Sequence, residues 1–206
     1  MLESSITWLL LTCFTIGAYL FGSISTAIIS CKIMGLPDPR SLGSGNPGAT
    51  NVLRTGSKTA AIITLLGDVI KGALPVLLVK LFTPNYPAWV YALVGLAAFL
   101  GHLYPLYYGF KGGKGVATAI GVLLAFSWPV FLAVVATWLL MAALFRYSAL
   151  AALTAFALAP VYTIYFSDGK MDWLIMVMIS IIIFWRHRSN IVRLYKGEET
   201  KLTDKT

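Results

Sequence analysis

Long apolar runs dominate this sequence and limit what the chain can fold into. A helix that crosses about 30 Å of hydrocarbon needs roughly 20 apolar residues. Runs of this kind cover residues 6–33, 59–82, 88–108 and 148–166, and a shorter one covers 171–185. Charged residues make up only 12% of the chain, about half the share found in soluble domains. The sequence therefore predicts an all-α integral membrane protein, 1–206, with a single polytopic domain.

The stretch 116–145 could form one long helix, or two short spans broken at Ser127-Trp128-Pro129, because proline interrupts a helix. Lys and Arg are enriched on the cytoplasmic side of a membrane, and their distribution decides between one long helix and two short spans. One unbroken helix would place Arg146 and the basic C-terminal segment outside. We therefore predict the break, with seven transmembrane helices, the N-terminus outside and the C-terminus in the cytoplasm. In that topology, 13 of the 16 basic residues lie on the inner side: Lys32, Arg40, Arg54, Lys58, Lys111, Lys114, Arg146, Arg186, Arg188, Arg193, Lys196, Lys201 and Lys205.

Three polar segments fall on this inner side, and the first, GSGNPGATN, covers residues 43–51. Its glycines allow consecutive backbone N–H groups to converge on an anion. Its hydroxyl and amide side chains add donors, and Arg54 just beyond offers a fork that matches phosphate. An ordinary loop with an Asn-Pro-Gly turn is the alternative. The candidate residues for anion binding are Gly43, Ser44, Gly45, Asn46, Gly48, Thr50, Asn51 and Arg54.

The second polar segment is Lys111-Gly112-Gly113-Lys114-Gly115. It does not match a nucleoside triphosphatase P-loop, because Gly115 follows the lysine and helices flank the loop. Flexible backbone donors with two ammonium groups nevertheless predict a second phosphate site. The alternative is a short basic turn that obeys the charge rule alone.

The third polar segment follows the last apolar run. His187 and Asn190 are three residues apart and share one helical face, and an imidazole with a pKa near 6.5 suits proton transfer. A basic cluster at the lipid headgroups is the alternative, and it is our interpretation of Arg193 and Lys196. The carboxylates Glu198 and Glu199 are interpreted as a solvated tail. Three further candidates could support the site from inside the bundle: His102 and the expected ion pair of Asp68 and Lys71.

These segments resemble the bacterial acyl-phosphate:glycerol-3-phosphate acyltransferases, the PlsY family, over nearly the whole chain. The resemblance implies transfer of a long-chain acyl group from acyl phosphate to the 1-hydroxyl of glycerol 3-phosphate. The products are 1-acyl-glycerol 3-phosphate (lysophosphatidate) and phosphate, in phospholipid biosynthesis at the cytoplasmic face of the bacterial inner membrane. It also implies no cofactor and no nucleic acid, with a soluble enzyme that makes the acyl phosphate as a candidate partner. The sequence itself predicts no metal site, because its two histidines are far apart and no carboxylates or thiolates are clustered. Residues from about 200 to 206 are expected to form a flexible polar tail.

The resemblance also implies roles for the candidate residues. Ser44, Arg54, His187 and Asn190 are the expected catalytic group. The segment 44–48 would hold the donor phosphate, and Lys114 with the Gly112 and Gly113 backbone would hold the acceptor phosphate. The base stays open between His187 and an oxygen of the donor phosphate.

Two other functions are alternatives to the acyltransferase. A small anion transporter would need a polar path across the membrane, whereas the only charges away from the ends of the predicted spans are Asp68 and Lys71. A membrane scaffold would leave all three polar segments unexplained.

Overall fold

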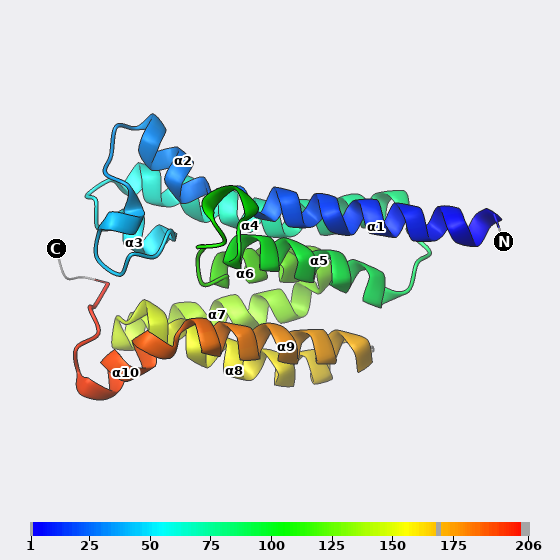
Figure 1. Cartoon of the computed structure of the whole chain (residues 1–206). Coiled ribbons are helices and arrows are strands. Elements are labelled where there is room, and N and C mark those ends of the chain that lie inside the picture. The colour runs from blue at the N-terminus through cyan, green and yellow to red at the C-terminus, as the bar shows by residue number, and fades with distance from the viewer. Residues whose placement is uncertain (1, 168–169, 203–206) are drawn as a thin grey trace.

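The computed structural model describes residues 2–167 and 170–202, and this part of the chain is entirely helical and irregular, without a strand. Figure 1 shows the longer helices running side by side as one bundle. The elements in chain order are α1 (Leu2–Gly22), α2 (Thr26–Ile33), η1 (Pro39–Ser41), α3 (Ala49–Leu53), α4 (Lys58–Phe82), α5 (Ala88–Leu103), η2 (Leu106–Tyr108), α6 (Val116–Phe126), α7 (Trp128–Phe145), α8 (Ser148–Phe166), α9 (Lys170–Arg186) and α10 (Arg188–Lys196).

Four helices are long and apolar enough to cross a membrane, and there are six candidates if each of two bent helix pairs counts as one span. The four are α4, α5 with η2, α7 and α8. The bent pairs are α1 with α2, at 42°, and α9 with α10, at 57°. The apolar run 6–33 therefore forms a bent pair of helices and not one straight helix. The chain leaves the helix at Ser23–Ser25, where the Lys71 ammonium donates to the Ile24 carbonyl at 2.9 Å.

The break predicted within 116–145 is present. α6 ends at Phe126 and α7 begins at Trp128. Pro129 occupies the first turn of α7, where backbone N–H groups have no partner within the helix, so a proline there costs no hydrogen bond. The Lys80 ammonium of α4 donates to the Ala125 carbonyl at 2.7 Å and to the Phe126 carbonyl at 3.3 Å. A cation at this position satisfies the free carbonyls at a helix C-terminus and complements its dipole. With 11 residues, α6 rises about 16 Å and is much shorter than a full span.

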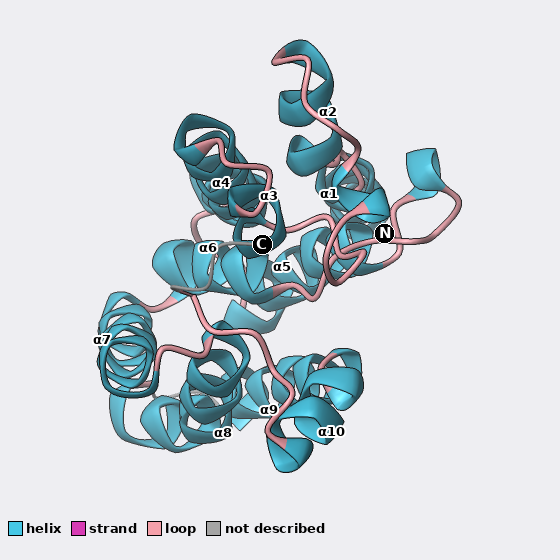
Figure 2. Cartoon of the chain, turned by 90° about the vertical axis from the view of Figure 1, so that its left-hand side faces the viewer, coloured by secondary structure: helices cyan, strands magenta, loops and turns pink. Residues whose placement is uncertain are grey.

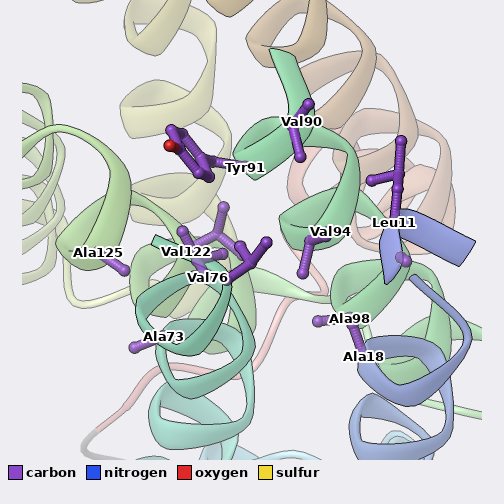
Figure 3. Close-up of a cluster of buried hydrophobic side chains, with 12 residues drawn as sticks. Leu11, Ala18, Ala73, Val76, Val90, Tyr91, Val94, Ala98, Val122 and Ala125 are labelled. Carbon is purple, nitrogen blue, oxygen red and sulfur yellow. The ribbon is translucent and has the colours of Figure 1, made fainter. Parts of the chain in front are cut away.

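Two apolar clusters hold the bundle together, and α5 and α6 contribute to both. The first cluster joins α5 and α6 to α1 and α4; in Figure 3, Val76 and Val122 lie next to each other, and Val94 lies between them and Leu11. The second cluster joins the other faces of α5 and α6 to α7, α8 and α9, around Phe156. α6 is thus packed against α4 on one side and against α7 on the other. Its position in turn fixes the loop that precedes it.

Glycines allow the closest helix contacts. A Cβ at Gly22 of α1 would lie 2.1 Å from the Ala98 carbonyl oxygen of α5, and one at Gly72 of α4 would lie 2.1 Å from the Thr118 carbonyl oxygen of α6. Both distances are far inside van der Waals contact. These helices therefore pack backbone against backbone, which is the usual role of small residues in membrane bundles.

One end of the bundle gathers the loops that carry the three polar segments. In Figure 1, α2, α3 and α10 lie together at the end opposite the start of α1, and Figure 2 looks onto this end. The segment after α10 turns back at Gly197, and the Leu202 N–H donates to the Arg146 carbonyl at 2.7 Å. Residues 203–206 of the predicted polar tail lie outside the described residues.

Candidate active site

A cavity of about 630 Å³ opens at this loop end and receives residues from all three polar segments. Among the predicted site residues, Gly45, Lys71, Lys111, Gly112 and Gly113 are not part of its lining. The predicted residues that do line it are Gly43, Ser44, Asn46, Gly48, Thr50, Asn51, Arg54, Asp68, His102, Lys114, His187 and Asn190. The convergence of three segments separated by some 60 to 75 residues is the central feature of the site.

Asn51 organises the first segment. Its Nδ2 donates to the Pro39 carbonyl at 2.6 Å and to the Leu42 carbonyl at 3.0 Å, and its Oδ1 accepts from the Ser44 N–H at 3.1 Å. The loop bends sharply at Gly43, whose φ of +50° is a left-handed conformation that suits glycine. The Asn51 amide is hydrogen-bonded within its own loop and thereby positions Ser44 at the cavity. A direct contact of Asn51 with substrate stays a prediction.

Arg54 and Thr50 leave the short helix α3 in different directions. A Cβ at Gly43 would lie 3.0 Å from the Arg54 Nη1, so the guanidinium packs over the glycine loop. The Arg54 guanidinium forms no hydrogen bond or ion pair with the residues that the structure describes, and Arg54 lines the cavity. Thr50 shares a hydrogen bond of 3.2 Å with Ser148 at the start of α8. The first segment is thus anchored to the other half of the bundle.

The second segment differs from its prediction. The Gly112 N–H donates to the Leu103 carbonyl at 3.2 Å, and the Gly113 N–H donates to the His102 carbonyl at 3.1 Å. Both N–H groups are therefore occupied by the end of α5 and do not form a phosphate nest. Arg186 holds the opposite side of the same loop, with Nη2 donating to the carbonyls of both glycines at 2.8 Å.

The glycines of this loop are required by space. A Cβ at Gly113 would lie 2.0 Å from the His102 Nε2, and one at Gly115, where φ is +88°, would lie 2.2 Å from the Phe99 ring. The loop can therefore press flat against α5 and direct Lys114 into the cavity. Lys111 is exposed and lies outside the cavity, so the predicted pair of ammonium groups is reduced to one.

Lys114 begins a chain of polar contacts that reaches the third segment. Its Nζ donates to the Asn190 Oδ1 at 2.5 Å, and the Asn190 Nδ2 donates to the Glu199 Oε1 at 2.7 Å. The other oxygen of Glu199 accepts from the Arg193 Nε at 2.7 Å. The pKa of Lys114 is lowered to about 8, chiefly by burial; Glu199 opposes this shift, and the charges of Arg193, Arg186 and Arg54 add to it.

His187 lies between α9 and α10 and is almost fully buried. Its Nδ1 lies 2.8 Å from the Ile183 carbonyl, which can only accept, so Nδ1 carries the proton and Nε2 is left as an acceptor at the cavity. Burial, followed by the charge of Lys114, lowers the pKa of His187 to about 4. The imidazole is therefore neutral near pH 7. It can accept a hydrogen bond at Nε2, but it is a weak base.

The predicted ion pair inside the bundle is present. The Lys71 Nζ lies 2.8 Å from the Asp68 Oδ1, and both side chains are buried. The His102 Nδ1 is 3.7 Å from the same oxygen, on the side of the pair that borders the cavity. These three residues connect the break between α1 and α2 to the glycine loop that rests on His102.

The rest of the cavity is an apolar groove. It continues from the polar end between α4, α6 and α7, along the bundle axis. Its lining side chains are Leu65, Leu66, Val69, Val116, Ile120, Leu124, Phe131, Val135, Trp138 and Leu139. The site therefore joins a cluster of cations to a surface that fits a hydrocarbon chain.

Sequence reasoning missed three members of the site. Glu199 was interpreted as a solvated tail and Arg193 as a headgroup contact, but both line the cavity. Arg186 was counted only as an inner-side charge, although it fastens the glycine loop. The signal for Glu199 was Gly197, whose φ of +72° ends α10 and returns the chain toward Asn190.

Comparisons with known proteins agree with this geometry. The family model for glycerol-3-phosphate acyltransferase matches residues 12–197. A glycerol-3-phosphate acyltransferase of Thioalkalivibrio sulfidiphilus is 58% identical over 200 residues, which cover 96% of this chain and 97% of that protein. One of Methylococcus capsulatus is 54% identical over 186 residues, which cover 90% of this chain and 92% of that protein.

Solved structures show the same fold. The crystal structure of PlsY (YgiH), an integral membrane glycerol 3-phosphate acyltransferase, in its glycerol 3-phosphate form matches with a TM-score of 0.87 and 39% identity. The match covers 93% of this chain and 94% of that chain. Its lysophosphatidic acid form matches with a TM-score of 0.86 and 38% identity. On these grounds the chain belongs to the glycerol-3-phosphate acyltransferase family, of which PlsY is a structurally known member.

Proposed function

We propose that this acyltransferase moves a long-chain acyl group from acyl phosphate to the 1-hydroxyl of glycerol 3-phosphate. The products are 1-acyl-glycerol 3-phosphate and phosphate. The observation that carries the proposal is the single cavity in which Arg54 and Lys114 meet an apolar groove. Both substrates carry a phosphate, and only the donor carries a long hydrocarbon tail. The anion transporter is not favoured, because the named relatives are acyltransferases.

The proposed topology has seven spans, with the N-terminus outside and the catalytic loops in the cytoplasm of a bacterium, at its inner membrane. Two observations support it. α6 and α7 are separate helices, which gives the seventh segment. The three polar segments lie at the same end of the bundle (Figure 1). That end would take glycerol 3-phosphate from the cytoplasm, and a soluble enzyme that makes acyl phosphate could deliver the donor there.

The donor is placed with its phosphate at Ser44 and Arg54 and its tail in the groove. Arg54 can supply the paired donors that phosphate oxygens accept, and it engages no other described side chain. The groove runs away from this point along α6 and α7 to Leu124 and Phe131. A tail in this position leaves the acyl carbonyl between the polar end and the apolar end of the cavity.

The acceptor is placed with its phosphate at Lys114. Asn190 holds the lysine from behind, and His187 presents Nε2 as an acceptor for a hydroxyl of the glycerol. Precise placement of the two reactants is itself a large share of catalysis. These two side chains therefore orient the 1-hydroxyl toward the acyl carbonyl.

The proton of that hydroxyl goes to the donor's own phosphate. A histidine with a pKa of about 4 is a weak base near pH 7, whereas a phosphate group has a second pKa of about 6. The hydroxyl oxygen attacks the carbonyl carbon, the bond from carbon to the phosphate oxygen breaks, and phosphate leaves with the proton. Ser44 is not a nucleophile in this scheme, because its side-chain partner is the Asn51 amide, which takes no proton.

The test supplies the purified protein in detergent with palmitoyl phosphate and glycerol 3-phosphate. Lysophosphatidate and phosphate should form in equal amounts, and the Ser44→Ala and Arg54→Lys variants should lose most of the rate. Palmitoyl-CoA should not replace palmitoyl phosphate. Turnover with palmitoyl-CoA, or a covalent acyl group on Ser44, would contradict the proposed donor or the direct transfer.

A further inference from the structure

One primary amine faces the reaction chamber. Lys114 is the only lysine among the described residues that line the cavity. Its Nζ donates to the Asn190 Oδ1, and it forms no ion pair with a carboxylate in the described part of the chain. The nearest acidic side chain, Glu199, is already bonded to Asn190 and Arg193. The amine is therefore held in place without a counter-ion of its own.

We propose that Lys114 is a modification site, at which the bound acyl donor N-acylates the ε-amino group when the acceptor site is empty. This inference rests on the proposed function, because it requires acyl phosphate as the donor. Acyl phosphates are activated acids and transfer their acyl group to amines as well as to hydroxyls. In the productive complex the acceptor stands between the donor and Lys114.

The geometry of the productive complex brings the carbonyl near the amine. The acceptor's phosphate is placed on Lys114, and its 1-hydroxyl must touch the acyl carbon. The carbonyl therefore lies within the length of one glycerol phosphate from Nζ. Lysine has a long flexible stem with rotatable bonds. Lys114 lines the same cavity as the apolar groove that would hold the donor's tail.

The environment supplies the reactive form of the amine. A pKa lowered to about 8 leaves roughly 300 times more neutral amine near pH 7 than an exposed lysine has. The physical causes are burial and the positive charges of Arg193, Arg186 and Arg54. The same positive charges that favour the binding of phosphate therefore also increase the fraction of Lys114 that is a neutral, reactive amine.

The proposed reaction balances without a further reagent. The neutral nitrogen attacks the acyl carbon, and a C–N bond forms. The bond from carbon to the phosphate oxygen breaks, and phosphate leaves with the bonding electrons and the proton of the amine. The product is an amide on Lys114, which removes the cation that binds the acceptor and fills the cavity with the tail.

The acceptor would protect the enzyme in two ways. Its phosphate occupies the space beside Lys114, and its negative charge favours the ammonium form, which is not nucleophilic. Inorganic phosphate should have the same effect without consuming the donor. The enzyme would therefore lose activity when acyl phosphate is present and both glycerol 3-phosphate and inorganic phosphate are absent.

The experiment incubates the full-length protein with palmitoyl phosphate and no acceptor, and maps the acylated residues by mass spectrometry. Exposed Lys32 and Lys196 serve as internal references. We expect at least about tenfold higher occupancy at Lys114, since its free-amine fraction is larger and the donor is bound beside it. The label should rise with pH toward 8, resist hydroxylamine as an amide does, and fall when inorganic phosphate is added. Activity lost should equal the fraction of Lys114 that is acylated.

Matched variants separate this site from general acylation. Lys114→Arg should lose the specific label, and Lys196→Arg, outside the cavity, should keep it. Equal labelling of Lys32, Lys114 and Lys196, or no label in an enzyme that turns over acyl phosphate when acceptor is added, would overturn the inference alone. No turnover of acyl phosphate under any condition would instead overturn the proposed function, and this inference with it.

Discussion

Arg186 is forked onto the backbone of Gly113, with Nε at 3.1 Å and Nη2 at 2.8 Å from the same carbonyl oxygen. The two residues are 73 positions apart, and the contact joins the end of α9 to the loop before α6. Tyr104 covers the guanidinium at 5.5 Å from its ring centre. The loop that directs Lys114 into the cavity is thus held through its N–H groups by α5 and through its carbonyl groups by Arg186.

Replacing this fork should weaken acceptor binding. Arg186→Lys keeps a positive charge but cannot make the paired contacts, so the glycine loop should lose its fixed position. Hydrogen bonds to charged groups contribute about 1.5–3 kcal/mol, which corresponds to roughly a tenfold or larger rise in the KM for glycerol 3-phosphate. Steady-state kinetics measure it. Arg188→Lys is the matched control, because Arg188 contacts Trp185 outside the cavity, and an equal effect there would contradict this role.

Gly113→Ala should fail for lack of space. The new Cβ would lie 2.0 Å from the His102 Nε2, in a buried contact where overpacking costs about 1–3 kcal/mol. We expect a lower midpoint of thermal unfolding in detergent and a higher acceptor KM. Gly17→Ala is the control, since no atom lies within 4 Å of the Cβ it adds to α1. If Gly113→Ala unfolds at the temperature of the wild type, the close contact with His102 is wrong.

The KM for the acceptor should rise as pH increases through about 8. The pKa of Lys114 is lowered in the empty enzyme, so the ammonium that binds phosphate is present below that pH and is lost above it. Lys114→Arg keeps its charge throughout this range, and its KM, although higher, should be constant over the same pH values. A wild-type KM that stays flat from pH 7 to about 9 would contradict the assignment.

His187→Ala should change the acceptor KM more than kcat. The imidazole is neutral near pH 7 because its pKa is lowered to about 4, and it orients the acceptor through Nε2. The dependence of kcat on pH should therefore be the same in His187→Ala as in the wild type, because any titration near pH 6 belongs to the donor phosphate, whose second pKa is about 6. A collapse of kcat with an unchanged KM would restore His187 as the general base.

Much of the site could be predicted from local chemistry. The first segment, Lys114, His187 and Asn190 were recognised because glycine, amide and cationic residues are out of place at the ends of apolar helices. The break near Ser127 was predicted from Pro129 together with the distribution of basic residues. Their convergence in one cavity followed from the predicted topology, which puts all three segments on one side.

The rest depended on packing that sequence patterns do not encode. The glycines at 112 and 113 are equally compatible with open backbone donors and with a loop pressed on α5, and only the position of His102 distinguishes the two. The break at Ser23–Ser25 has no proline, and it is stabilised by Lys71 from another helix. Glu199 belongs to the site because the chain reverses after α10; Gly197 indicates a turn there, but a glycine alone does not tell where the turn directs the chain.

The short helix α6 has a consequence for how the protein is made. Its last carbonyls are satisfied by Lys80, which belongs to α4 and precedes α6 in the chain. In hydrocarbon those carbonyls would otherwise lack donors, at a cost of several kcal/mol each. During synthesis, α4 leaves the ribosome first and carries the required donor into the bilayer. Because α4 precedes α6 in the chain, the donor that the end of α6 requires is synthesised before α6 itself.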